Sequence, residues 1–146
     1  MHSEIEIVSW KEQYATGIPL IDHQHMELVH LTNKLYLACL GGSESANSGF
    51  KEAMSHMVEY VHFHFDAELK LLEKMHYPRY AEHKKMHETM LLNILEAVNE
   101  YETGKKFIPN KFVRTLVDWV FSHIAIYDKD YAIFAADLQK RGLLAV

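Results

Sequence analysis

Apolar residues recur every three or four positions along four long stretches of this chain, which is the spacing of one face of an α-helix. The clearest stripe passes through Met54, Met57 and Val61 and continues in register to Leu71 and Met75. Glycine, proline, serine and asparagine gather between the stretches, and these residues typically end helices. The pattern predicts four helices, over about residues 19–40, 48–75, 78–103 and 109–128.

Four helices of this length with short connections predict an all-α fold, an up-down-up-down four-helix bundle. Residues 1–18 are predicted to form an irregular arm, with Trp10 and Tyr14 as its packing anchors. Residues 130–146 are predicted to form a short amphipathic helical tail that covers the bundle with Tyr131. Since the sequence contains no strand pattern, repeat or linker, we expect the whole chain to form a single domain.

Seven polar residues stand on these helices where a bundle normally places hydrophobic side chains, and every helix contributes at least one. Burying a histidine or a carboxylate is costly unless something satisfies it, and a central metal site would do so. Five imidazoles and two carboxylates suit a pair of iron ions better than one ion, which rarely takes seven ligands. The predicted ligands are His25, His64, Glu68, His83, His87, His123 and Asp128.

The spacing within each helix supports most of this set. His64 and Glu68 are four residues apart and therefore share a helix face, and His83 and His87 have the same spacing.

Asp128 fits the pattern less simply. The stripe of the last helix passes through Leu116, Trp119, His123 and Ile126, and Asp128 follows His123 by five residues. In a regular helix that separation is a rotation of roughly 140°. A ligand role for Asp128 therefore requires a π-type bulge or a distorted helix end, and spacing alone favours an ordinary solvated acid.

The remaining histidines lie off the predicted stripes or outside the helices, and we interpret them as solvated. A second di-iron pattern, the Glu-x-x-His motif of ferritin-like bundles, occurs three times, but its residues lie off the stripes, so we treat these matches as coincidental. The six remaining histidines are His2, His23, His30, His56, His62 and His76.

Composition narrows the possible functions. The net charge of -5, without a basic stripe, argues against nucleic-acid binding. The first ten residues lack the basic start of a signal peptide, and no apolar run approaches the length of a membrane span. Cys39 is the only cysteine, so an intramolecular disulfide is excluded. We therefore expect a cytoplasmic protein.

The ordered motifs resemble those of hemerythrins, specifically the single-domain bacterial members. The resemblance spans about residues 10–131 and includes Ile-Asp-His-Gln-His at 21–25, His-Phe-x-x-Glu at 64–68, His-x-x-x-His at 83–87 and His-x-x-x-x-Asp at 123–128.

The resemblance implies a role for each ligand. His83, His87 and His123 would bind one iron, and His25 and His64 would bind a second iron that keeps an open position. Glu68 and Asp128 would bridge the pair, together with an oxo or hydroxo group. The implied function is reversible binding of O2, held as a hydroperoxide at the open iron, for transport, storage or delivery; the sequence indicates no acceptor protein.

Two other functions stay open at this stage. The same centre could serve a di-iron enzyme that acts on nitric oxide or peroxide, or a sensor of O2, redox state or iron. The apolar neighbours of the ligand stripe favour simple O2 binding without turnover. We predict that Trp119, Val120 and Ile124 line the O2 pocket, although ordinary core packing would explain them equally well.

Overall fold

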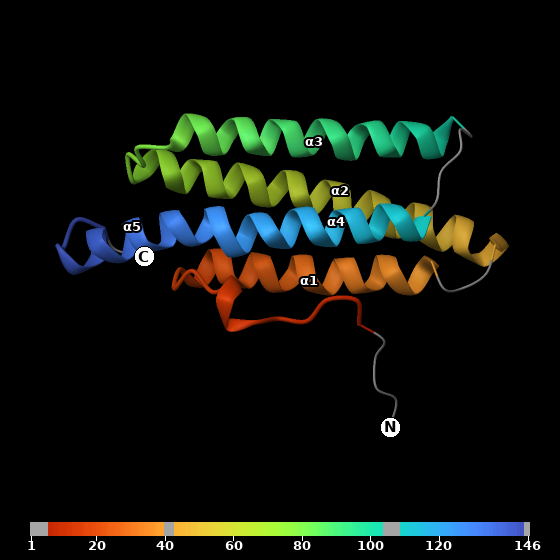
Figure 1. The fold of residues 1–146 in the computed structure, drawn as a ribbon, viewed down its shortest axis with the longest axis horizontal. Coiled ribbons are helices and arrows are strands. Elements are labelled where there is room, and N and C mark those ends of the chain that lie inside the picture. The colour runs from red at the N-terminus through yellow and green to blue at the C-terminus, as the bar shows by residue number, and fades with distance from the viewer. Residues whose placement is uncertain (1–5, 40–42, 104–108, 145–146) are drawn as a thin grey trace, which may run out of the picture.

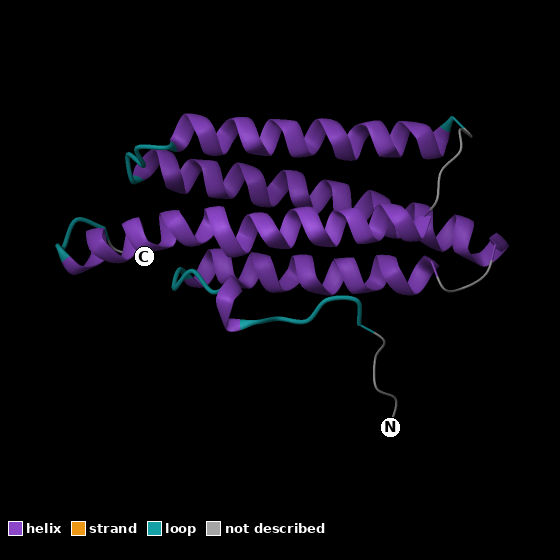
Figure 2. Cartoon of the chain, viewed as in Figure 1, coloured by secondary structure: helices purple, strands orange, loops and turns teal. Residues whose placement is uncertain are grey.

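The computed structural model describes residues 6–39, 43–103 and 109–144, and nearly all of them are helical (Figure 2). The main helices are α1 (Pro19–Cys39), α2 (Ser43–Lys74), α3 (Tyr80–Glu102) and α4 (Pro109–His123). A π-helical turn η2 (Ile124–Asp128) follows α4, and α5 (Lys129–Lys140) follows that turn. A single 3-10 turn, η1 (Glu12–Tyr14), interrupts the N-terminal arm.

The four long helices lie side by side as a bundle, as the sequence predicts (Figure 1). Helix α1 packs on both α2 and α4, and α3 packs on α2. Within the described part of the chain there is no strand, and no helix is long and apolar enough to cross a membrane.

The C-terminal tail differs from the expectation of a separate segment. Helix α4, the π turn and α5 form one continuous rod, which extends past the end of α1 (Figure 1). The reason is local: no proline or glycine occurs between residues 124 and 140, so nothing ends the helix after the last predicted ligand.

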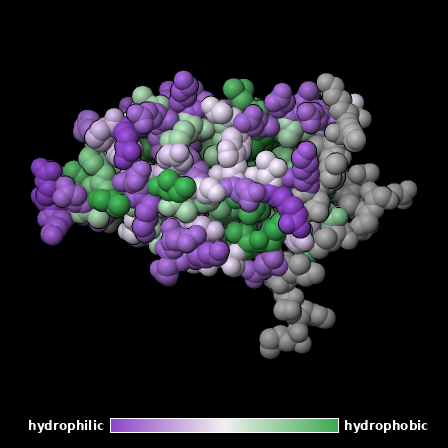
Figure 3. Space-filling model, in the orientation of Figure 1, coloured by the Kyte–Doolittle hydropathy of each residue, from purple (hydrophilic) through white to green (hydrophobic). Residues whose placement is uncertain are grey.

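Two stripe positions also differ from the prediction. Leu72 is fully buried, whereas its neighbour Leu71 is only partly buried. Ile126 is 58% exposed and lies within the π turn, where the regular helical spacing on which the prediction rested does not apply. On the face shown in Figure 3, polar and apolar side chains are mixed.

Two apolar clusters fill the bundle, one on each side of the predicted ligands. The larger includes Leu28, Val61 and Ile124, and the smaller includes Ile21 and Leu72. On α1, for example, Ile21 and Leu28 belong to different clusters and His25 lies between them. The polar site therefore lies between the two apolar clusters and interrupts the hydrophobic core.

The arm is fastened to the bundle by polar contacts as well as by packing. The side chain of Asn33 accepts hydrogen bonds from the amides of Ile7 and Val8 and donates one to the Val8 carbonyl. The ring of Tyr14 is buried against Phe121, with ring centroids 5.6 Å apart. The arm thus follows α1 as a fixed layer.

The end of the arm is shaped by Asp22, which lies in the first turn of α1. Its carboxylate accepts hydrogen bonds from the amide and hydroxyl of Thr16 and from the amide of Gly17. Gly17 has a φ of +77°, a conformation that side-chain-bearing residues rarely adopt. This turn fixes the start of α1 at Pro19, six residues before His25.

Candidate metal centre

All seven predicted ligands converge in the middle of the bundle and all are buried. The atoms that could hold a metal ion form two groups, within each of which they lie no more than 4.8 Å apart. One group contains Glu68, His83, His87 and His123, and the other contains His25, His64, Glu68 and Asp128.

The three-histidine side is built around one oxygen of each carboxylate. Oε1 of Glu68 lies 2.7 Å from Nε2 of His83 and 2.9 Å from Nε2 of His87. Oδ1 of Asp128 lies 3.2 Å from Nε2 of His83 and 3.3 Å from Nε2 of His123.

The two-histidine side is built around the other oxygens. Oε2 of Glu68 lies 3.2 Å from Nε2 of His64 and 3.7 Å from Nε2 of His25. Oδ2 of Asp128 lies 3.3 Å from Nε2 of His25. Each carboxylate therefore directs one oxygen toward each group of imidazoles, which is the arrangement that two bridging ligands require.

Many of these buried atoms have no hydrogen-bond partner, although they lie close together. Both ring nitrogens of His25 and His87, Nε2 of His123 and both oxygens of Asp128 are unsatisfied. Leaving such groups unsatisfied would cost free energy, and native proteins generally avoid it. Neutral imidazoles and carboxylates directed at shared points fit a pair of transition-metal ions.

Without metal, the site holds its charges through mutual contacts. Burial lowers the pKa of His25, but contacts with Asp128 and Glu68 outweigh burial and raise this pKa to about 9. The same balance raises the pKa of His83 to about 9. Burial lowers the pKa of His87, and this effect prevails there.

The two carboxyl groups respond in the opposite direction. Burial would raise the pKa of Glu68, but contacts with His25, His64 and His83 hold it well below its usual range. Burial and the charge of Glu68 would raise the pKa of Asp128, and neighbouring histidines again reverse the sign. The metal-free site thus pairs two carboxylates with two imidazolium groups.

The π turn explains how Asp128 reaches the site. Residues Ile124–Asp128 form a π helix, so the five-residue step from His123 completes one turn instead of overshooting it. The π-type bulge, one of the two ways in which Asp128 was expected to be able to reach the inner face, is present. The alternative of a solvated acid is wrong, because Asp128 is only 1% exposed.

The histidines outside the predicted set are placed as expected wherever the structure describes them. His23, His30, His56, His62 and His76 are all exposed, and His2 lies outside the described residues.

Three residues that the sequence did not single out as site residues support the ligands. Nδ1 of His64 donates a hydrogen bond to Oε1 of Gln24 at 2.7 Å, which leaves Nε2 free to bind metal. The hydroxyl of Tyr131 donates to Oε2 of Glu68 at 2.9 Å. The ring of Phe65 stacks on His87 with centroids 3.7 Å apart.

A signal for two of these residues was present in the sequence. Gln24 precedes His25 and Tyr131 follows Asp128 by three residues, so both lie within one helical turn of a predicted ligand. Their partners, however, are on other helices, and spacing along one helix does not reveal them.

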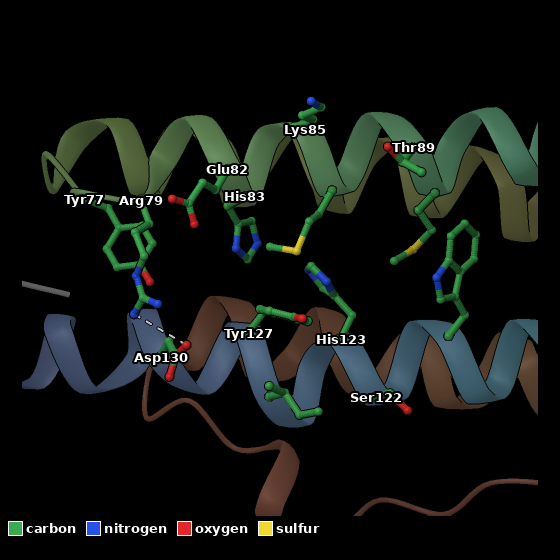
Figure 4. A pocket seen from close by; sticks show the side chains of 14 residues that line it. Tyr77, Arg79, Glu82, His83, Lys85, Thr89, Ser122, His123, Tyr127 and Asp130 are labelled. Atoms are coloured by element: carbon green, nitrogen blue, oxygen red, sulfur yellow. Dashed lines mark ion pairs between the residues drawn. The ribbon is translucent and has the colours of Figure 1, made fainter.

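A groove of about 790 Å³ opens between α3 and the α4–α5 rod (Figure 4). His83 and His123 point toward one another across it, so the groove reaches the three-histidine side (Figure 4). Trp119 and Tyr127 line the α4 side of the groove, and Glu82 lies on the opposite side.

The three residues predicted to line an O2 pocket lie in two different environments. Val120 and Ile124 are buried in the larger apolar cluster, each 2% exposed. Trp119 is only half-buried and lines the groove.

Fold and site together define a four-helix bundle protein whose centre holds a histidine and carboxylate cluster that could bind metal. The family model described as "Hemerythrin HHE cation binding domain" matches residues 16–132. The chain therefore belongs to the hemerythrin family, as the sequence motifs indicated.

Individual relatives agree with this assignment. The chain is similar to a bacteriohemerythrin of Stenotrophomonas maltophilia, with 29% identity over 126 residues, 86% of this chain and 80% of the relative. It is also similar to a bacteriohemerythrin of Pseudomonas aeruginosa, with 30% identity over 122 residues, 84% of this chain and 77% of the relative.

Solved structures match the fold. A wild-type hemerythrin structure superposes with a TM-score of 0.80 at 24% identity, covering 86% of this chain and 95% of the other. A hemerythrin point mutant gives a TM-score of 0.82 at 23% identity.

Proposed function

We propose that this chain binds O2 reversibly, as a carrier, storage or delivery protein, at a non-haem centre of two iron ions joined by an oxo or hydroxo group. The observation that carries the proposal is the unequal division of buried ligands. Three imidazoles serve one group and two serve the other, while both carboxylates reach both groups.

The ligand set suits a pair of metal ions, which we propose to be iron, and leaves room for a small molecule. His83, His87 and His123 would hold one ion, and His25 and His64 the other, with Glu68 and Asp128 shared between them. The second ion would have one fewer imidazole, which would leave a position for O2. When bound, the iron pair supplies two electrons to O2 and recovers them when O2 leaves.

Apolar side chains surround the two-histidine side. Leu28 lies one turn after His25 on α1, and Val61 lies one turn before His64 on α2. Both belong to the buried cluster that also contains Ile124. These side chains would exclude water and protons from bound O2, which slows its irreversible loss as reduced oxygen.

The supporting hydrogen bonds would hold the ligands in place during this cycle. Gln24 fixes the ring of His64, and Tyr131 holds the Glu68 oxygen that faces the two-histidine side.

The direct test is anaerobic reconstitution with iron, followed by metal analysis and repeated exchange between O2 and argon. We expect two irons per chain and a visible charge-transfer band that appears with O2 and disappears completely under argon. A band that decays at once, with sustained consumption of nitric oxide or peroxide, would instead establish a di-iron enzyme.

Replacing His64 with alanine should distinguish the role of the two-histidine side from that of the three-histidine side. We expect the His64→Ala protein to lose the reversible band while keeping its helical circular dichroism, because the three-histidine group is intact. A stable oxygen adduct in this variant would contradict the assignment of the open position.

A further inference from the structure

We propose that the groove between α3 and the α4–α5 rod is the route by which hydrated Fe²⁺ enters and leaves the metal centre. The inference rests on the proposed di-iron function but concerns a different property, the rate of metal exchange. It assigns a role to surface residues that bind no metal in the finished centre.

The seven ligands are almost completely enclosed, and the groove is where they come nearest to solvent. His123 is the most exposed of them at 6%, whereas His25 and Glu68 are 0% exposed. His123 and His83 both line the groove. An incoming ion would therefore meet these two imidazoles first.

The chemistry of His123 supports this order of contact. Its side chain is more than nine-tenths buried, and Nε2 has no hydrogen-bond partner. This nitrogen lies 3.3 Å from Oδ1 of Asp128, so an ion bound here would also reach one of the bridging carboxylates.

The other approaches to the centre are more tightly packed. Helices α1 and α2 approach each other closely along their length, and α1 also packs on α4. The arm covers part of that side, where Tyr14 packs on Phe121 and Lys129 donates a hydrogen bond to the carbonyl of Ala15. Helices α3 and α4 are instead separated by the groove.

The size of the groove suits a hydrated cation, and its lining carries charges of both signs. Its volume of about 790 Å³ far exceeds the share of one water molecule in the liquid, about 30 Å³. Two carboxylates, Glu82 and Asp130, and two cations, Arg79 and Lys85, line it, and Asp130 lies 3.4 Å from Arg79 at one end (Figure 4). Glu82 has no ion-pair partner among the described residues, so its charge remains available to attract a cation.

The test uses the full chain and measures metal exchange instead of O2 binding. Uptake of Co²⁺ by metal-free protein is followed by its visible absorption, and release is followed after adding excess chelator. Thr89→Trp and Ser122→Trp add bulk to the two walls of the groove at exposed positions. Ser55→Trp is the matched control on α2, at an exposed position outside the groove.

We expect both groove variants to slow uptake and release by the same factor, about tenfold, which corresponds to a modest increase in the barrier. The affinity and the final content of two ions per chain should be unchanged, since obstructing a path alters both rates equally. Ser55→Trp should exchange metal at the original rates.

Charge provides an independent variant pair on one helix. Glu82→Gln should slow Co²⁺ uptake at low ionic strength, and added salt should remove the difference. Glu96→Gln, an exposed position on α3 outside the groove, should leave the uptake rate unchanged.

Unchanged rates in folded Thr89→Trp and Ser122→Trp proteins would overturn the route. Faster release in Asn33→Ala, which loosens the arm, combined with unchanged groove variants, would assign the route to the arm side. Failure of the unsubstituted chain to bind two ions would refute the proposed function itself, so the two failures are distinguishable.

Discussion

Gln24 is a buried residue that positions a predicted metal ligand, His64, without being a ligand itself. It is 3% exposed, and its only assigned contact is the hydrogen bond from Nδ1 of His64. That bond fixes both the tautomer and the orientation of the imidazole. Gln24 would therefore act on a bound metal ion through His64.

Replacing Gln24 with leucine should weaken metal binding at the two-histidine side by roughly 10- to 100-fold, since partners of this kind typically contribute that much. Competition with a chelator of known affinity measures the effect. Gln24→Glu keeps the acceptor and should retain most of the affinity. Equal losses in both variants would show that the hydrogen-bond acceptor at this position does not account for the contribution of Gln24.

The titration of the metal-free site predicts an unusual dependence of stability on pH. The pKa values of His25 and His83 are raised from 6.5 to about 9. Their contribution to the free energy of unfolding is therefore complete below about pH 6.5 and is lost as the pH rises through about 9. The pKa of His87 is lowered, so this residue changes the free energy of unfolding in the opposite direction, but it is one group against two.

We therefore expect metal-free protein to become less stable between about pH 6.5 and 9. Urea unfolding in the presence of a chelator measures this change. At acid pH, stability should fall again as Glu68 and Asp128, whose pKa values are lowered, take up protons. A flat profile above neutral pH would contradict the paired-charge description of the empty site.

At the scale of elements, the π turn is the feature that completes the site. It places His123 and Asp128 on the same face of the helical rod. One turn further along, the same face carries Tyr131, which contacts Glu68. A π turn is equivalent to one extra residue in a regular helix. Its removal and its enlargement should therefore have different consequences.

Deleting Ile126, which is 58% exposed, should convert the turn to regular helix with the acid four residues after His123, still on the inner face. We expect this variant to bind two metal ions. Inserting one alanine after Ile126 should instead rotate the acid by roughly 100° and abolish binding at the shared position. Metal analysis after reconstitution distinguishes these outcomes, and metal loss in both variants would show that the bulge itself is required.

For the whole molecule, metal binding and folding are linked because the ligands come from every long helix. Binding that is confined to the folded state stabilises it by about 4 kcal/mol per site when free metal exceeds Kd a thousandfold. For a chain of this size, that corresponds to roughly 10 °C in Tm.

We expect a chelator to lower Tm by at least that amount while the metal-free protein stays helical at low temperature. Two large apolar clusters persist without the ions, and they support the bundle. Calorimetry with and without chelator measures the shift. Complete loss of helical structure in the metal-free protein would show that the apolar clusters alone are insufficient.

The sequence by itself determined the bundle and the members of the site. Helical periodicity along each stretch places His25, His64, Glu68, His83 and His87 on apolar stripes, and the cost of burying them indicates metal. These inferences depend only on spacing within one helix, which the chain encodes locally.

Only the tertiary structure decided how these helices meet. The continuity of α4 with α5, the phase of Asp128, and the contacts of Gln24 with His64 and of Tyr131 with Glu68 depend on packing between elements. The groove has the same origin, since it exists because α3 and α4 are held apart. Contacts between residues 40 or more positions apart are set by the packing of whole helices, which no periodicity within one helix records.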